Sequence, residues 1–587
     1  MTKLFLQTML LGFFFLEGTA LAEEINVKNG HSGCAPCAAT GDGTTDDLPA
    51  LRSIVQQMSA GDTLYFPAGS YRFNFDGVTG AALSIDDLDN LTIRGDGVGA
   101  STIIVDHMDS AGVEAVGTAT GFNITNSSGV TIRDLTVRGD VEVLPELHPD
   151  YNPPGTGQTV IEDITDVAAT GIFIGDGCPN LLVEDVEVKW FHNFGIRVFS
   201  TASTIDNDNI TLRNLWIHDI TRFYDFQPGG FEPVGSTPYG FYVHGVGTGT
   251  IANIRIADSL FENIGNPHRH TSFAIYLGDP VDNVTVTRNR FHGNPYTHDE
   301  EIQYQPSALI LHGDSKRVSI FDNRFKNQRL HLAGPAIVSN NLFENCYYVY
   351  GYWEGLVIEN NMFVGNANPF LNGQGDPAPA FFLSMGEDAK VETLGWMTQI
   401  TNNRFLTYEG QLVCGIRGAI SQRQCILNNT FTNCNVGIRL EASDFGGHVI
   451  DGNTFFQGGP YSIQIYHSTA NGTSLGVSWE SNRISNNKFI DQPGTGRAIE
   501  DESGSGQVMV YKNNSLTNLT LFSATHPDPP ANGLDLIGPV GLKAYTTADR
   551  NDLNTAELNA GTLVWDSDLD EAYLWDGTNW VPVSTGP

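Results

Sequence analysis

The chain has 587 residues and combines 67 acidic with 31 basic side chains, which gives a formal net charge of −36. Binding to nucleic acid or to an anionic membrane surface needs lysine and arginine gathered on one face, so this balance argues against both functions. Hydrophobic residues make up 40% of the sequence, which is enough to bury a large core and argues against global disorder.

Residues 1–22 are predicted to be a cleavable signal peptide. A short basic start that contains Lys3 is followed by an almost wholly apolar run from Leu4 to Leu16, and then by the small-residue pattern Ala20-Leu21-Ala22. The apolar run is shorter than the roughly 20 residues that a membrane-spanning helix needs. We therefore expect a secreted or periplasmic protein that is not inserted in a membrane after cleavage.

Residues 23–62 are predicted to cap the N-terminal end of the fold. Cys34 and Cys37 have no second Cys-x-x-Cys pair at zinc-site spacing, so a local disulfide is expected. A helical run from Leu48 to Ser59 follows Thr45-Asp46-Asp47, whose side chains can cap a helix N-terminus. A capping element is expected wherever a stack of strands would otherwise leave its backbone unpaired.

A polar-Asn-x-Phe pattern recurs through the middle of the chain at a mean interval of about 28 residues, which is typical of a solenoid. Alternating stretches such as Val284-Thr285-Val286-Thr287 separate the copies and predict half-buried strands. Stacking coils of such strands buries a continuous core, with the repeated Asn residues in a ladder at a turn. We predict a β-solenoid over residues 63–521. The eight best copies end at Phe291, Phe325, Phe343, Phe363, Phe405, Phe431, Phe455 and Phe489.

The end of the chain is predicted to be a separate unit. Residues 522–536 contain a Pro-rich linker. Residues 537–587 are expected to form a small β module around Trp565, Trp575 and Trp580. Such a module is also a candidate for contacts between copies of the chain.

Three consecutive coils align in sequence at residues 239–244, 274–279 and 308–314. Equivalent outward residues on neighbouring coils lie about 4.8 Å apart, so a site is built from residues that share a repeat phase. With the aliphatic residues facing inward, the expected outward set is Arg197, Tyr242, His244, Tyr276 and His312, with Asp279 and Asp314 at the strand ends. Arg197, Tyr242, Tyr276 and His270 are candidate substrate contacts.

These residue types suit acid–base chemistry. Histidine and tyrosine exchange protons, and two carboxylates one coil apart can divide acid and base roles or hold Ca²⁺. Beyond this Ca²⁺ option, no metal ligand and no cofactor is assigned.

Two segments near the N-terminus resemble a known superfamily. Residues 41–47, GDGTTDD, and residues 66–71, FPAGSY, are similar to the opening of the pectate-lyase-like superfamily. The resemblance covers roughly residues 38–520 and implies a right-handed parallel β-helix. Because that superfamily includes pectin-type hydrolases, lyases, uronan epimerases and phage tailspikes, the resemblance implies the fold more specifically than the reaction.

Tyr239-Gly240-Phe241-x-x-His244 is similar to the YGFDPHE segment of bacterial mannuronan C5-epimerases. The resemblance implies that Tyr239 and His244 transfer the proton alpha to a uronate carboxylate, with Asp279 on the next coil as a supporting acid. Tyr242-Val243 replaces the Asp-Pro of that segment, and Gly245 replaces its Glu. The expected function is therefore an enzyme that modifies or cleaves a polysaccharide, first of all a lyase acting by β-elimination.

Two other functions stay open. A glycoside hydrolase would use Asp279 and Asp314, whose expected spacing of one coil approaches the roughly 5–5.5 Å of retaining enzymes. The NTD, GHG and RIK signatures of pectin hydrolases are absent from the sequence. A non-catalytic adhesin or tailspike-like glycan-binding protein fits the Trp-rich tail equally well.

Overall fold

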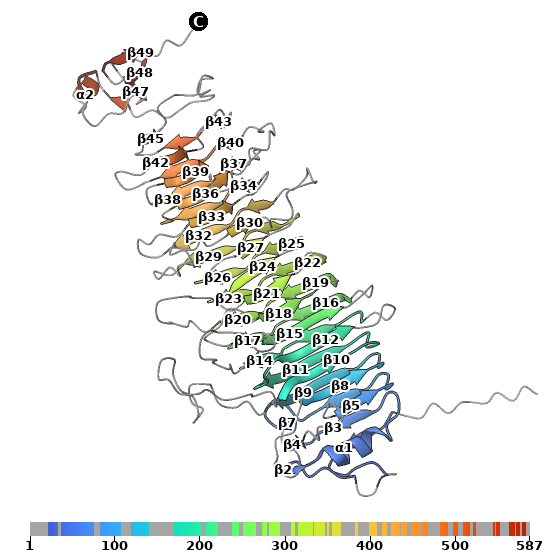
Figure 1. The fold of residues 1–587 in the computed structure, drawn as a ribbon. Coiled ribbons are helices and arrows are strands. Elements are labelled where there is room, and N and C mark those ends of the chain that lie inside the picture. The colour runs from blue at the N-terminus through green and yellow to red at the C-terminus, as the bar shows by residue number, and fades with distance from the viewer. Residues whose placement is uncertain are drawn as a thin grey trace, which may run out of the picture.

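The described part of the chain coils into an elongated stack of parallel strands, followed by a small separate sheet (Figure 1). The computed structural model describes residues 22–32, 34, 37–74, 83–106, 119–139, 168–200, 207–220, 238–245, 251–265, 273–278, 281–293, 307–311, 315–332, 334–346, 349–351, 355–365, 382–384, 398–407, 414–419, 424–434, 436–442, 448–456, 461–467, 482–490, 497–502, 509–512, 514–516, 520–523, 544–545, 547–551, 563–566, 568–569, 571–575 and 578–582. The predicted signal peptide lies outside these residues except for Ala22.

One side of the coil is a 15-stranded parallel sheet in which each strand pairs with the equivalent strand of the next coil. Its strands are β5 (Leu83–Asp86), β8 (Ala119–Thr125), β10 (Ala168–Ile174), β12 (Phe194–Ser200), β15 (Tyr239–Gly245), β18 (Phe273–Leu277), β21 (Ser307–Leu311), β24 (Arg329–Leu332), β27 (Val349–Gly351), β30 (Phe382–Ser384), β33 (Cys414–Ala419), β36 (Val436–Ala442), β39 (Tyr461–His467), β42 (Arg497–Glu502) and β45 (Thr520–Ser523).

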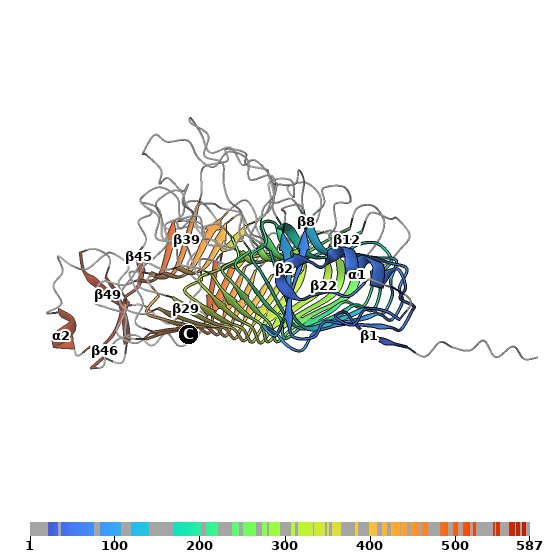
Figure 2. The same ribbon diagram turned by 90° about the horizontal axis from the view of Figure 1, so that it is seen from below.

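The rest of the coil belongs to a 30-stranded sheet, which usually contributes two short strands to each turn. Figure 2, which looks along the stack, shows β8, β12 and β39 on one side of the coil and β1 and β29 on the other. The strands are β1 (Glu24–Asn26), β2 (Asp42–Asp46), β3 (Thr63–Tyr65), β4 (Gly69–Asn74), β6 (Thr92–Arg94), β7 (Ser101–Asp106), β9 (Thr131–Arg138), β11 (Leu182–Lys189), β13 (Thr211–Arg213), β14 (Trp216–His218), β16 (Ile251–Ala257), β17 (Leu260–Glu262), β19 (Val281–Thr287), β20 (Arg290–His292), β22 (Lys316–Phe321), β23 (Arg324–Lys326), β25 (Ala336–Ser339), β26 (Leu342–Glu344), β28 (Val357–Glu359), β29 (Met362–Gly365), β31 (Gln399–Thr401), β32 (Arg404–Thr407), β34 (Cys425–Leu427), β35 (Thr430–Thr432), β37 (Val449–Asp451), β38 (Thr454–Phe456), β40 (Asn482–Ser485), β41 (Lys488–Ile490), β43 (Met509–Lys512) and β44 (Ser515–Leu516).

This arrangement confirms the predicted parallel β-helix. The coil begins earlier than residue 63, because β1 pairs with β3 and β2 pairs with β4 inside the stretch that was expected to act only as a cap. At the other end, β45 carries the 15-stranded sheet to Ser523. Within the described residues, no helix has the length and apolar character required to cross a bilayer.

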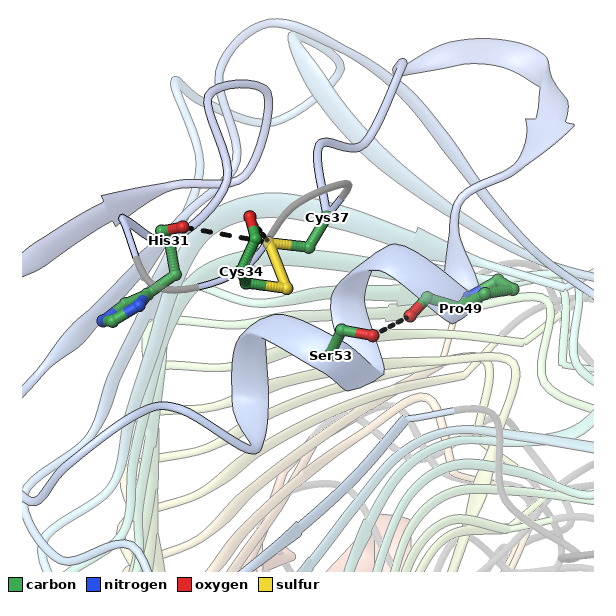
Figure 3. The surroundings of a disulfide bond; sticks show 5 residues. All are labelled: His31, Cys34, Cys37, Pro49 and Ser53. Carbon is green, nitrogen blue, oxygen red and sulfur yellow. Dashed lines mark hydrogen bonds between the residues drawn. A yellow bond between two sulfur atoms is a disulfide. The ribbon is translucent and has the colours of Figure 1, made fainter.

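The capping helix α1 (Leu48–Val55) lies at the N-terminal end of the stack and buries Leu48, Leu51 and Ile54 (Figure 1). It ends at Val55 rather than at Ser59. Of the predicted capping residues, Asp46 accepts the Leu48 backbone N–H at 3.1 Å, whereas the Asp47 carboxylate accepts hydrogen bonds from Thr40 instead. Cys34 and Cys37 form the expected disulfide beside this helix (Figure 3).

An internal ladder of amides runs along one corner of the coil. In each step the Asn side-chain N–H₂ donates to the next Asn Oδ1, and the same oxygen accepts the backbone N–H of the preceding Asn, as in Asn361, Asn403 and Asn429. The predicted turn conformation belongs to the residue before each ladder Asn, such as Asn402 with φ +57°, rather than to the ladder Asn itself. The full ladder is Asn289, Asn323, Asn341, Asn361, Asn403, Asn429, Asn453, Asn487 and Asn514.

The Phe residues two positions after the ladder Asn form the predicted interior column. All eight, from Phe291 to Phe489, are at most 3% exposed. Consecutive rings stack face to face, with centroids 4.8 Å apart between Phe363 and Phe405 and again between Phe405 and Phe431. The buried amides and the buried rings together hold successive coils in one register.

The C-terminal residues form a four-stranded sheet with one short helix, as predicted for a small β module. Trp575 is 6% exposed and its ring centroid lies 5.4 Å from that of Trp580, so these indoles pack within the module. Its elements are β46 (Ala544–Tyr545), α2 (Thr547–Asn551), β47 (Leu563–Asp566), β48 (Glu571–Trp575) and β49 (Trp580–Pro582).

The ladder leads us to predict that substituting two adjacent asparagines has very different effects on stability. Asn403→Ala leaves the buried amide N–H groups of Asn361 without their acceptor, so we expect a loss of about 3 kcal/mol in unfolding free energy. Asn402→Gly is the matched control, because Asn402 is exposed and glycine tolerates its positive φ. Thermal and denaturant unfolding of both variants measure the contrast. Equal stability of the two variants would contradict a structural role for the ladder.

The burial of His448 leads us to predict that the protein loses stability in acid. It is 4% exposed, its Nδ1 accepts the Gln424 backbone N–H at 3.3 Å, and burial lowers its pKa from 6.5 to about 4. Between these two values the unfolded chain takes up a proton that the folded chain excludes, so stability falls as pH drops, by about 3 kcal/mol in total.

His448→Asn keeps an acceptor at this position and removes the titration. As the pH falls from 7 to 4, we expect the melting temperature of the unmutated protein to drop by more than that of His448→Asn. A difference that stays constant over this range would show that His448 is not buried as a neutral imidazole.

Candidate functional site

The outer face of the 15-stranded sheet carries the residues expected to form a site. In β12, β15 and β18 one set of apolar side chains points inward and is fully buried, as Phe241, Val243 and Ile275 illustrate. Arg197, Tyr242 and Tyr276 are register partners on the three successive strands and are half-buried on the outer face. The structure therefore brings these three predicted residues into one column.

Two consecutive inward residues in each of these strands, such as Gly240 and Phe241, break the alternation and add a second outward column. Phe194, Tyr239 and Phe273 are register partners, and this inward pair separates each of them from the first column. Glycine is needed at the first inward position in β12 and β15, since a Cβ on Gly195 would lie 2.6 Å from the Gly240 carbonyl oxygen. The inward pair explains how Tyr239 and Tyr242 both reach the outer surface although they are three residues apart.

The two columns form a continuous aromatic surface. The Tyr239 ring lies between Phe194 and Phe273, with centroid distances of 5.2 and 5.5 Å. Tyr242 stacks on Tyr276 with centroids 4.9 Å apart, and Tyr239 meets both rings edge to face. Aromatic rings in this arrangement stabilise one another and present a rigid, largely apolar platform.

The guanidinium of Arg197 lies among these rings. It is 4.6 Å from the Phe199 centroid, 4.8 Å from Phe194 and 5.7 Å from Tyr242. Burial lowers the pKa of Arg197, and its buried Nε has no hydrogen-bond partner. Among the described residues no carboxylate pairs with Arg197, and the described contacts of its guanidinium are aromatic faces.

His244 lies two residues beyond Tyr242 on β15, half-buried and in register with Phe199. Its ring centroid is 6.1 Å from Tyr242 and 6.0 Å from Phe199. Gly278 makes room for the imidazole, because a Cβ there would lie 2.5 Å from His244 Nδ1. Along β15, Tyr242 stands between Tyr239 and His244, the two residues that the epimerase resemblance pairs.

Burial raises the pKa of Tyr242, and the positive charge of Arg197 opposes that rise. Tyr242 is therefore a neutral phenol over the physiological range, able to donate a hydrogen bond or a proton. Four predicted site residues, Asp279, His312, Asp314 and His270, lie outside the described residues.

Several residues of this face were not singled out from the sequence. Phe194, Phe273 and Phe199 complete the aromatic surface. His331 continues the Arg197 column by way of Ile310, and Tyr350 is the register partner of His331 on the next strand. The alternation in Leu330-His331-Leu332 matches that in Leu309-Ile310-Leu311 and was the available signal for His331, whereas the second column needed the three-dimensional register.

No group of three or more His, Cys, Asp or Glu side chains that could hold a metal ion occurs in the part of the chain that the structure describes. The carboxylates considered for Ca²⁺ from the sequence, Asp279 and Asp314, are not within that part.

The close approach of Gly278 to His244 leads us to predict that a side chain at position 278 changes the accessibility of His244. Gly278→Ala should force the His244 imidazole off its present place, so His244 should react severalfold faster with diethyl pyrocarbonate. Peptide mass spectrometry measures this, and His331 on β24 of the same sheet serves as the internal control. Unchanged reactivity at His244 would contradict the close approach of these two residues.

Comparisons with known proteins bear on the fold. The family model for a right-handed β-helix region matches residues 387–553. Among the curated proteins, no sequence matches the chain. Three similar solved structures are a mannuronan C-5 epimerase A-module from Azotobacter vinelandii, an α-1,3-glucanase catalytic unit from Streptomyces thermodiastaticus, and an N-terminal fragment of gene product 12 from bacteriophage phi29.

The epimerase module is 18% identical over 80% of this chain and 100% of its own, with a TM-score of 0.37. The glucanase is 13% identical over 86% of this chain and 71% of its own, with a TM-score of 0.36. The phage fragment is 16% identical over 88% of this chain and 74% of its own, with a TM-score of 0.48.

At these low identities and TM-scores the solved structures carry no information on the reaction. The family model and the stacked parallel coils together identify the chain as a right-handed parallel β-helix protein.

Proposed function

We propose that this protein is a secreted carbohydrate-active enzyme that binds an acidic polysaccharide along the outer face of β12, β15 and β18 and cleaves it by β-elimination. The observation that carries the proposal is Arg197, a desolvated cation among aromatic rings whose register partner, Tyr242, has its ring next to that of His244. An aromatic platform takes the apolar face of a sugar ring, and a guanidinium takes a carboxylate. A uronate residue offers both features.

Arg197 also supplies a local positive charge in a protein whose net charge opposes the binding of an acidic sugar. The chain carries a net charge of −36 and repels a polyuronate at long range. At contact distance, a half-buried guanidinium with no described carboxylate partner attracts the substrate carboxylate more strongly than an exposed one would. Binding of an acidic sugar therefore depends on this one position more than on the overall charge.

In the proposed reaction, His244 accepts the proton from the carbon alpha to the uronate carboxylate. The electrons of that C–H bond form the new carbon–carbon double bond, and the bond from the adjacent carbon to the glycosidic oxygen breaks. A tyrosine donates a proton to the departing oxygen. Arg197 binds the carboxylate and stabilises the negative charge that develops on it.

Two tyrosines are candidates for the acid. The epimerase resemblance assigns the role to Tyr239, whereas Tyr242 has its ring next to both His244 and Arg197. Tyr239→Phe and Tyr242→Phe separate the two, since each keeps its ring stacking and loses only the hydroxyl. The larger loss of kcat identifies the acid.

A panel of polyuronates and neutral glycans tests the proposal, read by the ultraviolet absorbance of unsaturated uronate and by new reducing ends. We expect both signals on a polyuronate. His244→Ala should lower kcat by about 10²–10⁴-fold, the usual contribution of a general base. Arg197→Met should raise KM by about tenfold or more, because a charge-assisted contact is lost.

His292→Ala is the matched control, because His292 is a half-exposed histidine on the other sheet. Full activity of His244→Ala would refute the proposed base. Reducing ends without unsaturation would mean hydrolysis and direct attention to Asp279 and Asp314. Binding of a glycan with no turnover by the unmutated protein would mean an adhesin.

A further inference from the structure

A second group of aromatic and charged residues lies on the 30-stranded sheet, away from the face just described. It is built on β9, β11 and β14, where Thr136, Glu187 and Trp216 are register partners. Trp216 is 40% exposed and is the one aromatic among the large exposed hydrophobic residues in the described part of the chain. This indole therefore does not belong to the core.

The exposed indole is held in a fixed orientation by buried charges. Trp216 stacks on the His218 ring with centroids 4.1 Å apart. His218 Nδ1 lies 2.6 Å from Asp219 Oδ2 and His218 Nε2 lies 3.0 Å from Glu187 Oε1. Both ring nitrogens are thus engaged by carboxylates, which fixes the imidazole that carries the indole.

Glu187 is itself fully bound. Its Oε2 accepts the Thr136 hydroxyl at 2.8 Å, and its Oε1 accepts the Lys189 ammonium at 2.9 Å. These contacts lower the pKa of Glu187 from 4.5 to about 2, although burial opposes the shift, and the carboxylates raise the pKa of His218 against the effect of its burial. Glu187 is therefore ionised at neutral pH. Burying charges is costly even when they are paired, and here they support a side chain at the surface.

A second indole lies one coil away, at the corner that follows β11. Trp190 directly follows β11 with φ +61°, a backbone conformation that is uncommon and costly for a bulky residue. The equivalent corner residues of the next two coils are Asp219 and Asn263, which adopt positive φ more readily. Lys189 and Arg138 lie over the Trp190 ring, at 4.6 and 5.2 Å from its centroid.

We propose that Trp216 and Trp190 form a second polysaccharide-binding site, in which sugar rings stack on the indoles and the ammonium of Lys189 contacts an acidic group of the sugar. This inference rests on the proposed function, because the ligand is a further segment of the same polysaccharide. The site holds substrate on a face of the coil different from that of Arg197 and His244. A long chain can then contact both faces, whereas a short oligosaccharide uses one.

The test compares binding and turnover separately. In the His244→Ala background, which holds substrate without converting it, Trp216→Ala should raise the dissociation constant for the polyuronate identified by the panel by about tenfold, the effect of losing one stacked ring. Trp216→Tyr should restore most of the affinity, since a ring is kept. Affinity electrophoresis or calorimetry measures both.

Ile337→Ala is the matched control, because Ile337 is an exposed apolar side chain, 45% exposed, on β25 of the same sheet. Its affinity should equal that of the parent. With His244 present, Trp216→Ala should leave kcat/KM on short oligosaccharides unchanged and lower it on the polymer.

If Trp216→Ala binds the polymer as tightly as its parent does, the second site is overturned and the proposed function stays intact. A loss on short oligosaccharides as large as on the polymer would also overturn it, because Trp216 would then act through the first site or the fold. Failure of the unmutated protein to bind or convert any polyuronate would overturn both proposals together.

Discussion

The amide ladder at the corner of the coil is the interaction on which the rest of this structure depends. Each ladder Asn satisfies its own side chain and a backbone N–H of the preceding rung, as Asn361 and Asn403 illustrate. A slip of one residue between coils would leave these buried groups unpaired, at a cost of about 1–3 kcal/mol for each. The stacked Phe column beside it adds the burial that makes the aligned coils stable.

The fixed register between coils brings residues from separate repeats together into a site. Because β12, β15 and β18 are aligned, Arg197, Tyr242 and Tyr276 form one column although they come from separate parts of the chain. The inward pairs that begin with Gly195 and Gly240 set a second column next to it, and together the two columns surround one cation with aromatic rings. On the other sheet the same alignment places Glu187 and Lys189 of β11 beside Trp216 and His218 of β14.

The fold could be predicted from the sequence because the same short pattern recurs in successive coils. Eight Asn-x-Phe copies and alternating strands predicted the solenoid, its interior Phe column and the outward placement of Tyr242, His244 and Tyr276. The ladder Asn was expected to adopt the turn conformation, but the preceding residue does so, because the ladder side chain must point into the core.

The rest of both sites depends on contacts that repetition does not reveal. Tyr239 reaches the outer face because two consecutive inward residues follow it, the first a glycine packed close to a carbonyl oxygen of the next coil, and only the register places Phe194 and Phe273 beside it. His218 and Glu187 are 31 positions apart and meet because β11 and β14 pair in register, and no local motif marks the pair.

The central claim is that an acidic sugar binds on the outer face of the 15-stranded sheet. The most direct measurement is a crystal structure of His244→Ala with an oligouronate bound. We predict a sugar ring packed on Tyr242 and Tyr276, with its carboxylate within hydrogen-bond distance of the Arg197 guanidinium. An oligouronate bound elsewhere on the protein, with this face empty, would contradict the account.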